Sequence, residues 1–556
     1  MTAKAADCLL RDADGALAEG DWARALTGYR RALDIAETPQ ALEGMSWAAL
    51  GLNDGETVIW ARQAAYRLFR RGGENVSAAR MAMWLGKDYA DFLGELAVAR
   101  GWRQRAHRLL EGQPLSPEHG WLAILECWAP LACGEDPVAV QARARNALAV
   151  AQQLRDPDIE ILALAIEGLA CVDEGRIEEG MARLDEAAAA VLGGELEHEI
   201  WALAVFCFLI YACKRVRDVN RAAQWCELMR QLADRLRHTG TQATCRAHYA
   251  AVMISRGDWQ AAEATLADAV AYYEASWPPQ SAEAIVSLAD LRRRQGRLDE
   301  ARDLLNRAAW HPRAALGLAQ IAFDAGQLRE SGEELDRFLR HIPEDNRLER
   351  IPALELRVEI VSLSGAREQA AAVLADLEDA AGRIATPLLR GSICVAKAAL
   401  ARAFGDLERA QACCEDAADM FEQSWAPYET ARARLDLADV LAALGETARA
   451  REQAAMARRE SNRLGAALLS ERAEAFLAEI DRQMAERENA PGSAPLTRRQ
   501  IEILDLVSRG FSDREISETL GISEHTVHRH MANILLRMDV PTRAAAVARA
   551  ASCGLL

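Results

Sequence analysis

The sequence predicts an all-α protein in which a long array of helix pairs precedes a small helical domain at the C-terminal end. Ala, Leu, Arg and Glu dominate the 556 residues, only 16 of which are Pro, and this composition is typical of helices. Glycines that precede helix starts recur at intervals of 30 to 40 residues over much of the chain, which is the spacing of helix-pair repeats. A different pattern, with closely spaced helix caps, follows residue 495.

In the array, predicted for residues 1–485, each repeat glycine ends one helix and the next helix begins directly after it. The last five intervals between these glycines are 39, 30, 39, 40 and 40 residues. A small residue early in the following helix would allow that helix to pack closely. The repeat glycines are Gly20, Gly175, Gly257, Gly296, Gly326, Gly365, Gly405 and Gly445, and the small residues are Ala261, Ala301, Ala370, Ala410 and Ala450.

A longer unit also repeats within the array. Residues 274–279 read EASWPP, residues 422–427 read EQSWAP, and each Trp lies 20 residues after a repeat glycine. This repetition resembles tetratricopeptide repeats. The resemblance implies an α-solenoid, whose concave wall typically binds peptides, protein partners or small ligands.

Aromatic residues of the array provide a candidate effector site. All 13 Trp lie before residue 486, and most are expected in the repeat cores. The most apolar stretch, Ile200 to Cys213, is too short to span a bilayer and is predicted to be a buried helix. The candidate effector-binding residues on it are Trp201, Phe206, Phe208 and Tyr211.

Charge is distributed unequally along the chain. The net charge is −17, of which residues 496–556 carry +1 and the remainder −18. An acidic body would repel phosphate, so contacts with nucleic acid are expected from the C-terminal segment alone. The 12 Cys form no CxxC pair and no zinc spacing with His, which predicts free thiols in a reducing cytoplasm, without a metal or cofactor. We find no secretion signal and no pattern of catalytic residues.

Residues 486–495 read ERENAPGSAP, and their polar residues with two Pro and one Gly predict a linker. Helix signals then define three helices in the C-terminal domain, residues 496–556. The first follows the capping box of Thr497 and Gln500, and the second follows Ser512. Gly521 supplies a tight turn, and Ser523 caps a third helix, which makes a helix-turn-helix. The predicted core residues are Ile501, Leu504, Val507, Ile516, Leu520, Val527, Met531, Ile534 and Met538.

The third helix, which should run to about Met538, can be oriented from its apolar stripe because each residue rotates about 100° around the helix axis. The opposite face, which would enter the major groove of DNA, carries His525, Arg529, Ala532 and Leu536, flanked by His528 and Asn533. Arg suits guanine and Asn suits adenine, so Arg529, His528 and Asn533 are the candidates for base readout. Ser523, Thr526 and Arg537 are better placed for phosphates.

The runs LTxxQxxIL, GFSxxEISxxLGISxxTVxxH, NILxRM and VxxRA closely resemble the LuxR-type DNA-binding domain along the whole of residues 496–556. The resemblance implies that Thr526 and Arg537 contact phosphates and that His528, Arg529 and Ala532 face the bases. It also implies a fourth helix, roughly Thr542 to Cys553, that mediates dimerisation on DNA through Thr542, Ala544, Val547, Ala548 and Ala551. Gln500 stands where the family usually has Glu, and His528 and Ala532 stand where basic residues are common.

Residues 427–450 resemble the repeat arrays of large LuxR-type regulators related to the maltose-regulon activator. Those regulators also carry a nucleotide-binding domain. The single Gly-Lys pair of this chain, Gly86-Lys87, lacks the preceding glycine of a phosphate loop.

These observations predict a bacterial transcriptional activator rather than an enzyme. Its repeats would sense an unknown small-molecule or protein effector, and its C-terminal domain would bind double-stranded promoter DNA as a homodimer or higher homo-oligomer, with RNA polymerase as a further partner and no membrane involved. The alternative is a protein-interaction scaffold whose repeats capture a regulatory partner and whose DNA binding is secondary. A regulator should protect a discrete palindrome, whereas a scaffold should co-purify with a protein.

Overall fold

The protein is all-α, as the composition predicts. In the computed structural model, the described ranges consist of α-helices joined by short turns, with a 3-10 helix at Pro278–Gln280, and they contain no strand. The structure describes residues 3–133, 137–198, 201–236, 239–276, 278–344, 346–382, 384–489 and 496–556. Two compact units divide the chain, the first formed by residues 1–440 with 456–470 and the second by residues 441–455 with 471–556.

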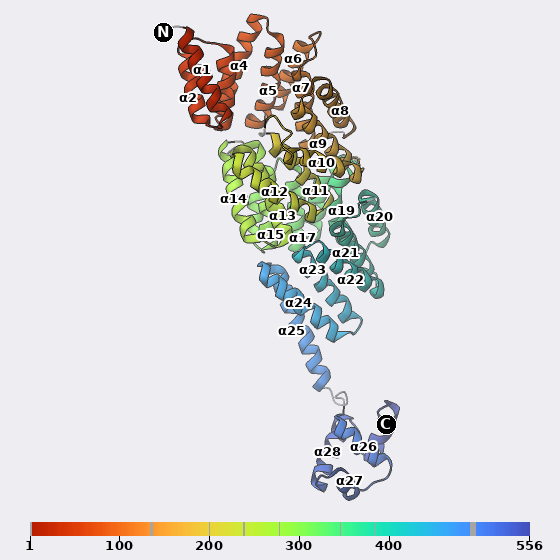
Figure 1. Ribbon diagram of the computed structural model, residues 1–556. Helices are drawn as coiled ribbons and strands as arrows, with labels where there is room; N and C mark the ends of the chain where they lie inside the picture. Colours follow the sequence, from red (N-terminus) through yellow and green to blue (C-terminus); the bar gives the residue numbers. More distant parts are fainter. Residues whose placement is uncertain are drawn as a thin grey trace. The chain divides into compact units, whose positions relative to one another are not determined.

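The first unit is a solenoid in which consecutive helices pack against each other as pairs (Figure 1). Its helices are α1 (Ala3–Ala18), α2 (Trp22–Leu33), α3 (Pro39–Gly51), α4 (Gly55–Gly72), α5 (Asn75–Leu93), α6 (Leu96–Leu110), α7 (Pro117–Cys133), α8 (Pro137–Leu154), α9 (Pro157–Asp173), α10 (Ile177–Leu192), α11 (Ala202–Val216), α12 (Val219–Leu236), α13 (Thr239–Arg256), α14 (Trp259–Ser276), α15 (Ala282–Arg294), α16 (Leu298–Arg307), α17 (Pro312–Asp324), α18 (Leu328–His341), α19 (Arg347–Leu363), α20 (Arg367–Ala381), α21 (Pro387–Ala403), α22 (Leu407–Gln423) and α23 (Pro427–Ala443). The last three residues of α23 belong to the second unit, and the next two helices, α24 (Thr447–Leu464) and α25 (Ala467–Asn489), also contribute residues to both units.

Glycine turns separate the helices of the solenoid. All eight repeat glycines adopt positive φ, from 74° to 86°. This left-handed backbone is unfavourable for residues with a Cβ atom, which explains why glycine recurs there. Ala301, Ala370 and Ala410 of the following helices are fully buried, as predicted. After Gly257, however, the prediction is displaced by one residue, because Ala262 is fully buried and Ala261 is only half-buried.

One apolar core of the solenoid joins residues of α7 to α13 with residues of α19 to α23, and a separate cluster lies among α17, α18 and α19. The predicted buried helix is α11, and Leu203, Phe206 and Leu209 on it are inaccessible to solvent. Two further apolar clusters lie among α1 to α7. No helix in the described ranges is both long enough and apolar enough to cross a membrane.

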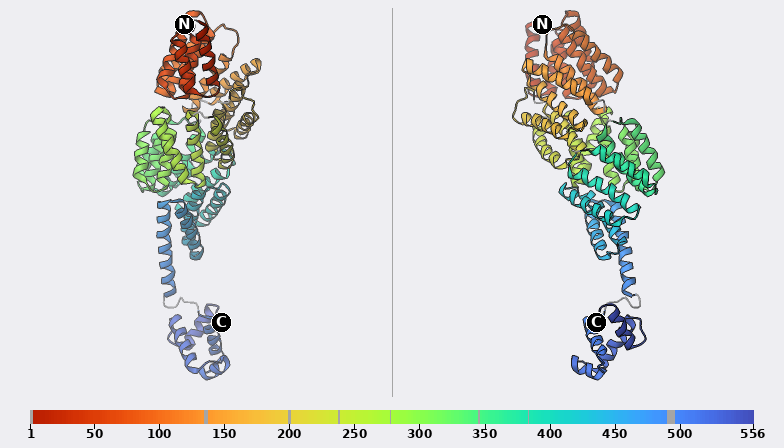
Figure 2. Two further views of the ribbon diagram at one scale, coloured as in Figure 1. Left: turned by 60° about the vertical axis from the view of Figure 1, so that its left-hand side comes forward. Right: turned by 90° about the vertical axis from the view of Figure 1, so that its right-hand side faces the viewer.

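Segments that are distant in sequence meet where the solenoid curves. The turn between α13 and α14 lies against α23 and the C-terminal half of α24, because a Cβ atom at Gly257 would be 2.7 Å from Leu464 Cδ2 and 2.8 Å from Pro427 Cγ. The guanidinium group of Arg294 on α15 donates a 2.8 Å hydrogen bond to Glu429 on α23. Figure 2 shows the helix pairs of the unit in two further views.

The first part of the predicted linker is helical. Helix α25 continues to Asn489, so residues 486–489 are helical. Glu and Arg, which occupy three of these four positions, are good helix formers, and a helix end at Asn489 agrees with Pro491 two residues later. The rest of the predicted linker, residues 490–495, lies outside the described residues, as does Trp277 of the longer repeat unit.

Residues 496–556 contain α26 (Arg498–Ser508), α27 (Asp513–Leu520), α28 (Glu524–Arg537) and α29 (Arg543–Ser552). They enclose an apolar core of their own, and its buried residues in the described part of the chain lie between Leu496 and Ala550. We refer to these four helices as the C-terminal domain.

Candidate nucleic-acid interface

Reciprocal caps begin the first two helices of the C-terminal domain. The backbone N–H of Thr497 donates to Gln500 Oε1 at 2.8 Å, and the backbone N–H of Gln500 donates to Thr497 Oγ1 at 3.2 Å. Gln500 therefore forms the complete capping box in place of Glu. Ser512 and Glu515 form a second capping box, and the hydrogen bonds from Ser512 lower the pKa of the Glu515 carboxyl.

The turn between α27 and α28 sets the direction of the third helix. Gly521 ends α27 in the left-handed conformation, with φ of 66°. Ser523 then caps α28 by accepting a 3.1 Å hydrogen bond from the backbone N–H of Thr526. The helix-turn-helix prediction is confirmed in its caps and in its turn.

Most of the predicted core is buried, but α26 turns a different face inward. Ile503 is fully buried although it was not predicted, whereas Ile501 and Val507 are half-buried. Helix α26 packs against both α28 and α29, which moves its buried face to Ile503 and Leu504. The remaining predicted core residues that are buried are Ile516, Val527, Met531, Ile534 and Met538, while Leu520 is partly buried.

The face of α28 opposite this core is exposed, as the helical arithmetic predicts. Arg529 and Asn533 lie on it, and Leu536 is 75% exposed. No residue that the structure describes forms an ion pair with Arg529. The other exposed residues of the face are His525, His528 and Ala532. An exposed polar face of this kind, on the second helix of a helix-turn-helix, is suited to the major groove.

His528 already has a partner within the domain. Its Nε2 lies 2.8 Å from Asp513 Oδ2, and the guanidinium group of Arg543 donates to both Asp513 oxygens at 2.5 Å. The hydrogen bond from Arg543 lowers the pKa of the Asp513 carboxyl. The three side chains connect α27, α28 and α29. Sequence reasoning missed Asp513 and Arg543, although Asp513 begins α27 and Arg543 belongs to the VxxRA run.

The candidate phosphate contacts lie at the two ends of α28. Ser523 Oγ and Thr526 Oγ1 are 2.8 Å apart at the first turn. Arg537, at the last turn, is half-buried and donates a 3.0 Å hydrogen bond to Gln500 Oε1. Arg537 thus also connects α28 to the capping box of α26.

Helix α29 agrees with the predicted fourth helix. Thr542 caps it by accepting a 3.2 Å hydrogen bond from the backbone N–H of Ala545. Ala546 and Ala550 are buried in the domain core. Of the residues predicted for dimerisation, Ala544, Ala548 and Ala551 are exposed and Val547 is half-buried, so the outer face consists mainly of small residues.

The four candidate effector residues lie on α11 or, for Trp201, at its N-cap. Phe206 is fully buried and Phe208 is 9% exposed in the solenoid core, so neither is accessible to a ligand. Trp201 packs against the rings of Trp84 and Trp121, with centroids 5.8 and 4.7 Å away. Tyr211 is half-buried near the Arg215 and Arg313 guanidinium groups, and burial raises its pKa.

Known proteins match the C-terminal part of the chain. Residues 494–550 match the family of bacterial regulatory proteins described as the LuxR family. The C-terminal domain is of the LuxR type. The chain is 52% identical over 52 residues to the transcriptional regulatory protein DegU of Brevibacillus brevis, a segment that covers 9% of this chain and 22% of DegU. Over 82 residues it is 38% identical to the nitrate/nitrite response regulator protein NarP of Escherichia coli, covering 15% of this chain and 37% of NarP. The aligned segments thus cover less than two fifths of the length of each of these relatives.

Solved helical-repeat proteins show a distant likeness to the chain. A tetratricopeptide repeat protein from Parabacteroides merdae has a TM-score of 0.33 at 14% identity, with 50% of this chain and 99% of that chain covered. The APC/C hetero-tetramer Cut9-Hcn1 has a TM-score of 0.36 at 12% identity, with 85% and 96% covered. The tetratricopeptide-like character of the first unit rests on its own helix pairs and glycine turns.

Proposed function

We propose that the chain is a DNA-binding transcriptional regulator, and specifically a cytoplasmic activator that binds promoter DNA as a homodimer through its LuxR-type domain. The observation that carries this proposal is the exposed face of α28. Arg529 and Asn533 project from a helix whose other face is fixed in the core by Val527, Met531 and Ile534. A rigid helix with free polar side chains can read base edges in the major groove.

The roles on α28 follow from the bonds that each side chain already makes. Arg529 has no ion-pair partner among the described residues, so it is the side chain for a bidentate contact with guanine. Asn533 would contact adenine, and Ala532 offers a methyl group to thymine. Thr526 and Arg537 would bind phosphates and fix the register of the helix on the duplex.

The outer face of α29 supports dimerisation on DNA. Ala544, Ala548 and Ala551 are exposed and small, so two copies of the helix could approach closely. A two-fold pair would present its recognition helices about 34 Å apart, which is the distance between successive major grooves on one side of B-DNA. The interface of such short helices is small, so DNA would stabilise the dimer.

Control by an effector is assigned to the first unit. A tetratricopeptide-like solenoid exposes a large surface for a ligand or a partner protein. The residues before the LuxR-type domain carry a net charge of −18, which opposes DNA binding by the solenoid itself. RNA polymerase would be the partner at the promoter.

Transcription with purified components tests the proposal. The full chain is first used to retain fragments of genomic DNA, and a retained promoter fragment then serves as the template for bacterial RNA polymerase. We expect the transcript to increase when the full chain is added, and the Arg529→Ala variant to give no increase. An unchanged transcript would contradict the activator assignment, and the absence of any preferentially retained fragment would contradict the regulator assignment.

A further inference from the structure

A histidine on the exposed face of α28 is held by a carboxylate from a neighbouring helix. The His528 side chain is 67% exposed, and its Nε2 lies 2.8 Å from Asp513 Oδ2 of α27. The Asp513 carboxyl is ionised at neutral pH, because the hydrogen bond from Arg543 lowers its pKa. An ionised carboxylate can only accept hydrogen bonds, so Nε2 of His528 carries a proton. Asp513 thus fixes the tautomer of the His528 ring.

The other ring nitrogen of His528 remains available. No residue that the structure describes forms a hydrogen bond with its Nδ1. This nitrogen is an acceptor when the ring is neutral and a donor when the ring is charged. Because Nε2 is protonated in both states, the ring gains its charge at Nδ1.

The net charge of the three side chains depends on His528. Asp513 and Arg543 neutralise each other, since the guanidinium group donates to both carboxylate oxygens. The cluster therefore carries no net charge when His528 is neutral and one positive charge when it is protonated. The C-terminal domain carries only +1 with its histidines neutral. One further proton is a large change for a domain that approaches phosphates.

The groups around His528 come from the helices that pack together at this point. The carboxylate of α27 and the guanidinium group of α29 are those described above. On α28 itself, Glu524 and His525 lie one turn before His528, and both are exposed. Helix α26 also packs against α28, but its hydrogen bond there, from Arg537 to Gln500, lies at the other end of that helix.

We propose that His528 takes up a proton at Nδ1 when the C-terminal domain binds DNA, and that Asp513 is the positioning residue for this contact. The charged ring donates from Nδ1 to an acceptor of the duplex, which is a phosphate oxygen or the O6 or N7 atom of guanine. Asp513 fixes the ring through Nε2 and leaves Nδ1 for the duplex. The inference rests on the proposed function, since it concerns the same face of α28.

The sign of the pH dependence follows from proton uptake. A complex that binds more protons than its free components is favoured when protons are more abundant. DNA affinity should therefore increase as the pH falls from 8 to 6, within the range in which histidine side chains change charge. The Asp513 carboxyl stays ionised throughout this range, because its pKa is lowered.

Titration calorimetry of the full chain with DNA measures the uptake directly, at pH 7 in phosphate and in Tris, whose ionisation enthalpies differ. The probes are a duplex from the retained genomic fragment and a scrambled duplex of the same length. We expect the wild type to take up about half a proton per copy. Uptake with both duplexes would assign the acceptor to phosphate, and uptake with the genomic duplex alone would assign it to a base. No uptake with either duplex would overturn the proposal.

His528→Gln keeps an N–H donor near Asp513 but cannot gain a proton. Its uptake should be close to zero, and the gain in affinity between pH 8 and pH 6, about tenfold in the wild type, should fall to about twofold or less. His530→Gln is the matched control, because His530 lies on the same helix, is half-buried and has no carboxylate partner in residues 496–556. It should retain the wild-type uptake. Equal uptake in the wild type and His528→Gln would assign the proton to another group and contradict the proposal.

Asp513→Asn distinguishes positioning from a simple charge effect. The substitution removes a negative charge, so electrostatic attraction alone would tighten DNA binding without changing the uptake. The positioning role predicts that the uptake falls to about half or less, and that Asp513→Asn has no further effect on uptake in a His528→Gln background. Unchanged uptake in Asp513→Asn, or the same reduction with and without His528, would contradict this role.

The same titrations also report the affinity for each duplex. DNA binding without proton uptake rejects only this inference. No binding to either duplex rejects the proposed function.

Discussion

The side chains on α28 differ in whether they already form hydrogen bonds or ion pairs within the C-terminal domain. His528 pairs with Asp513, and Arg537 donates to Gln500, so both side chains contribute to the packing of the domain. Arg529 has no ion-pair partner among the described residues. We therefore assign sequence discrimination mainly to Arg529, and a combined structural and phosphate-binding role to Arg537.

Arg529→Ala should reduce the affinity for the specific site by about 1 to 3 kcal/mol and relax the preference at one base pair, as expected for a lost bidentate contact. Arg509→Ala removes the same charge from the end of α26 and serves as the control. Mobility-shift titrations on specific and scrambled duplexes measure both variants. If both weaken both duplexes equally, Arg529 contributes only charge.

Asp513→Asn should loosen the junction of α27, α28 and α29 by about 1 kcal/mol, because it weakens the bonds to Arg543 and His528. Hydrogen–deuterium exchange of α29 in the full chain reports this change. Asp505→Asn, which weakens only the exposed ion pair with Arg509, should leave α29 protected. Equal deprotection by the two variants would contradict the role of Asp513.

The same junction should be sensitive to acid. The pKa of the Asp513 carboxyl is lower in the folded protein than its ordinary value of about 4. The contribution of ionised Asp513 to folding stability is therefore complete above that ordinary value, and it is lost as the pH falls through the lowered pKa. Exchange of α29, corrected for the intrinsic pH dependence, should therefore begin to rise below about pH 4 in the wild type. In Asp513→Asn this rise should be smaller, and an identical profile would contradict the assignment.

At the scale of helices, the caps and turns that the sequence predicts correctly depend on residues close together in the chain. Thr497 and Gln500 are three residues apart, and Gly521 fixes a turn by its own backbone, so both could be predicted without knowledge of the neighbouring helices. The buried face of α26 could not, because it depends on how α28 and α29 pack against that helix. The predicted register after Gly257 was wrong by one residue, since a repeat pattern places small residues only approximately.

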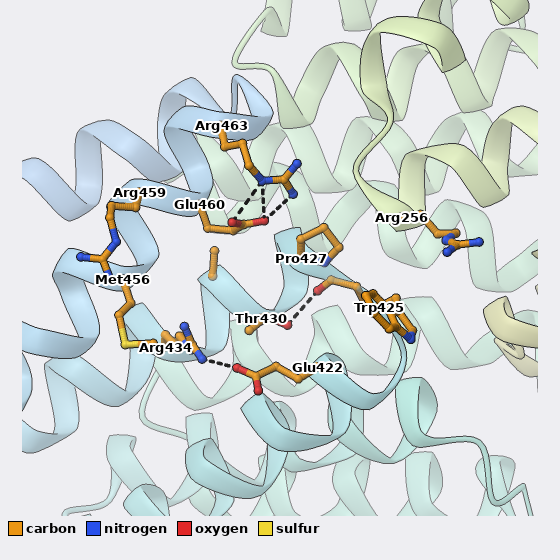
Figure 3. Close-up of a pocket in the computed structure, with 12 residues that line it drawn as sticks. Arg256, Glu422, Trp425, Pro427, Thr430, Arg434, Met456, Arg459, Glu460 and Arg463 are labelled. Carbon is orange, nitrogen blue, oxygen red and sulfur yellow. Dashed lines mark hydrogen bonds and ion pairs between the residues drawn. The ribbon is translucent and has the colours of Figure 1, made fainter.

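Contacts between distant residues could not be predicted from one sequence. Asp513 and Arg543 are 30 residues apart and meet only when the domain is folded. A groove of about 520 Å³ at Trp425 requires the curvature of the solenoid, which places the end of α13 beside α23 and α24 (Figure 3). One local signal was available, because Trp425 has φ of 52° at a turn where neighbouring repeats have glycine. The same hydrophobicity that makes the aromatic residues of α11 conspicuous in the sequence also buries Phe206 and Phe208 in the solenoid core.

Glycine should be required at the repeat turns because it accepts a left-handed backbone, and not because a Cβ atom would collide with its neighbours. Gly405 has φ of 81° and no atom near the position of a Cβ, so Gly405→Ala should destabilise α21 and α22 by about 1 kcal/mol through strain alone. Gly332 has equal space but lies inside α18 at helical φ. Gly332→Ala should therefore stabilise by about 0.5 to 1 kcal/mol. Local hydrogen exchange measures the stability change in each variant. Stability changes of the same sign in Gly405→Ala and Gly332→Ala would contradict this explanation.

For the whole molecule, the division of charge predicts autoinhibition. Residues before the LuxR-type domain carry −18 and the domain carries +1, and exposed charges interact over about 8 Å at physiological salt. A fragment of residues 490–556 should therefore bind DNA more tightly than the effector-free full chain. The difference should be largest at low salt, where repulsion is least screened. Anisotropy titrations across a salt series measure it, and tighter binding by the full chain at every salt concentration would instead make the solenoid a constitutive dimerisation device.

The central claim is that α28 of the LuxR-type domain reads a specific DNA sequence, and footprinting of the full chain on genomic fragments at physiological salt tests it most directly. We predict a discrete protected region with two half-sites about one helical turn apart. Arg529→Ala should abolish that protection at the same protein concentration, whereas Arg509→Ala should retain it. Uniform protection without a discrete site, or an unchanged footprint in Arg529→Ala, would contradict the claim.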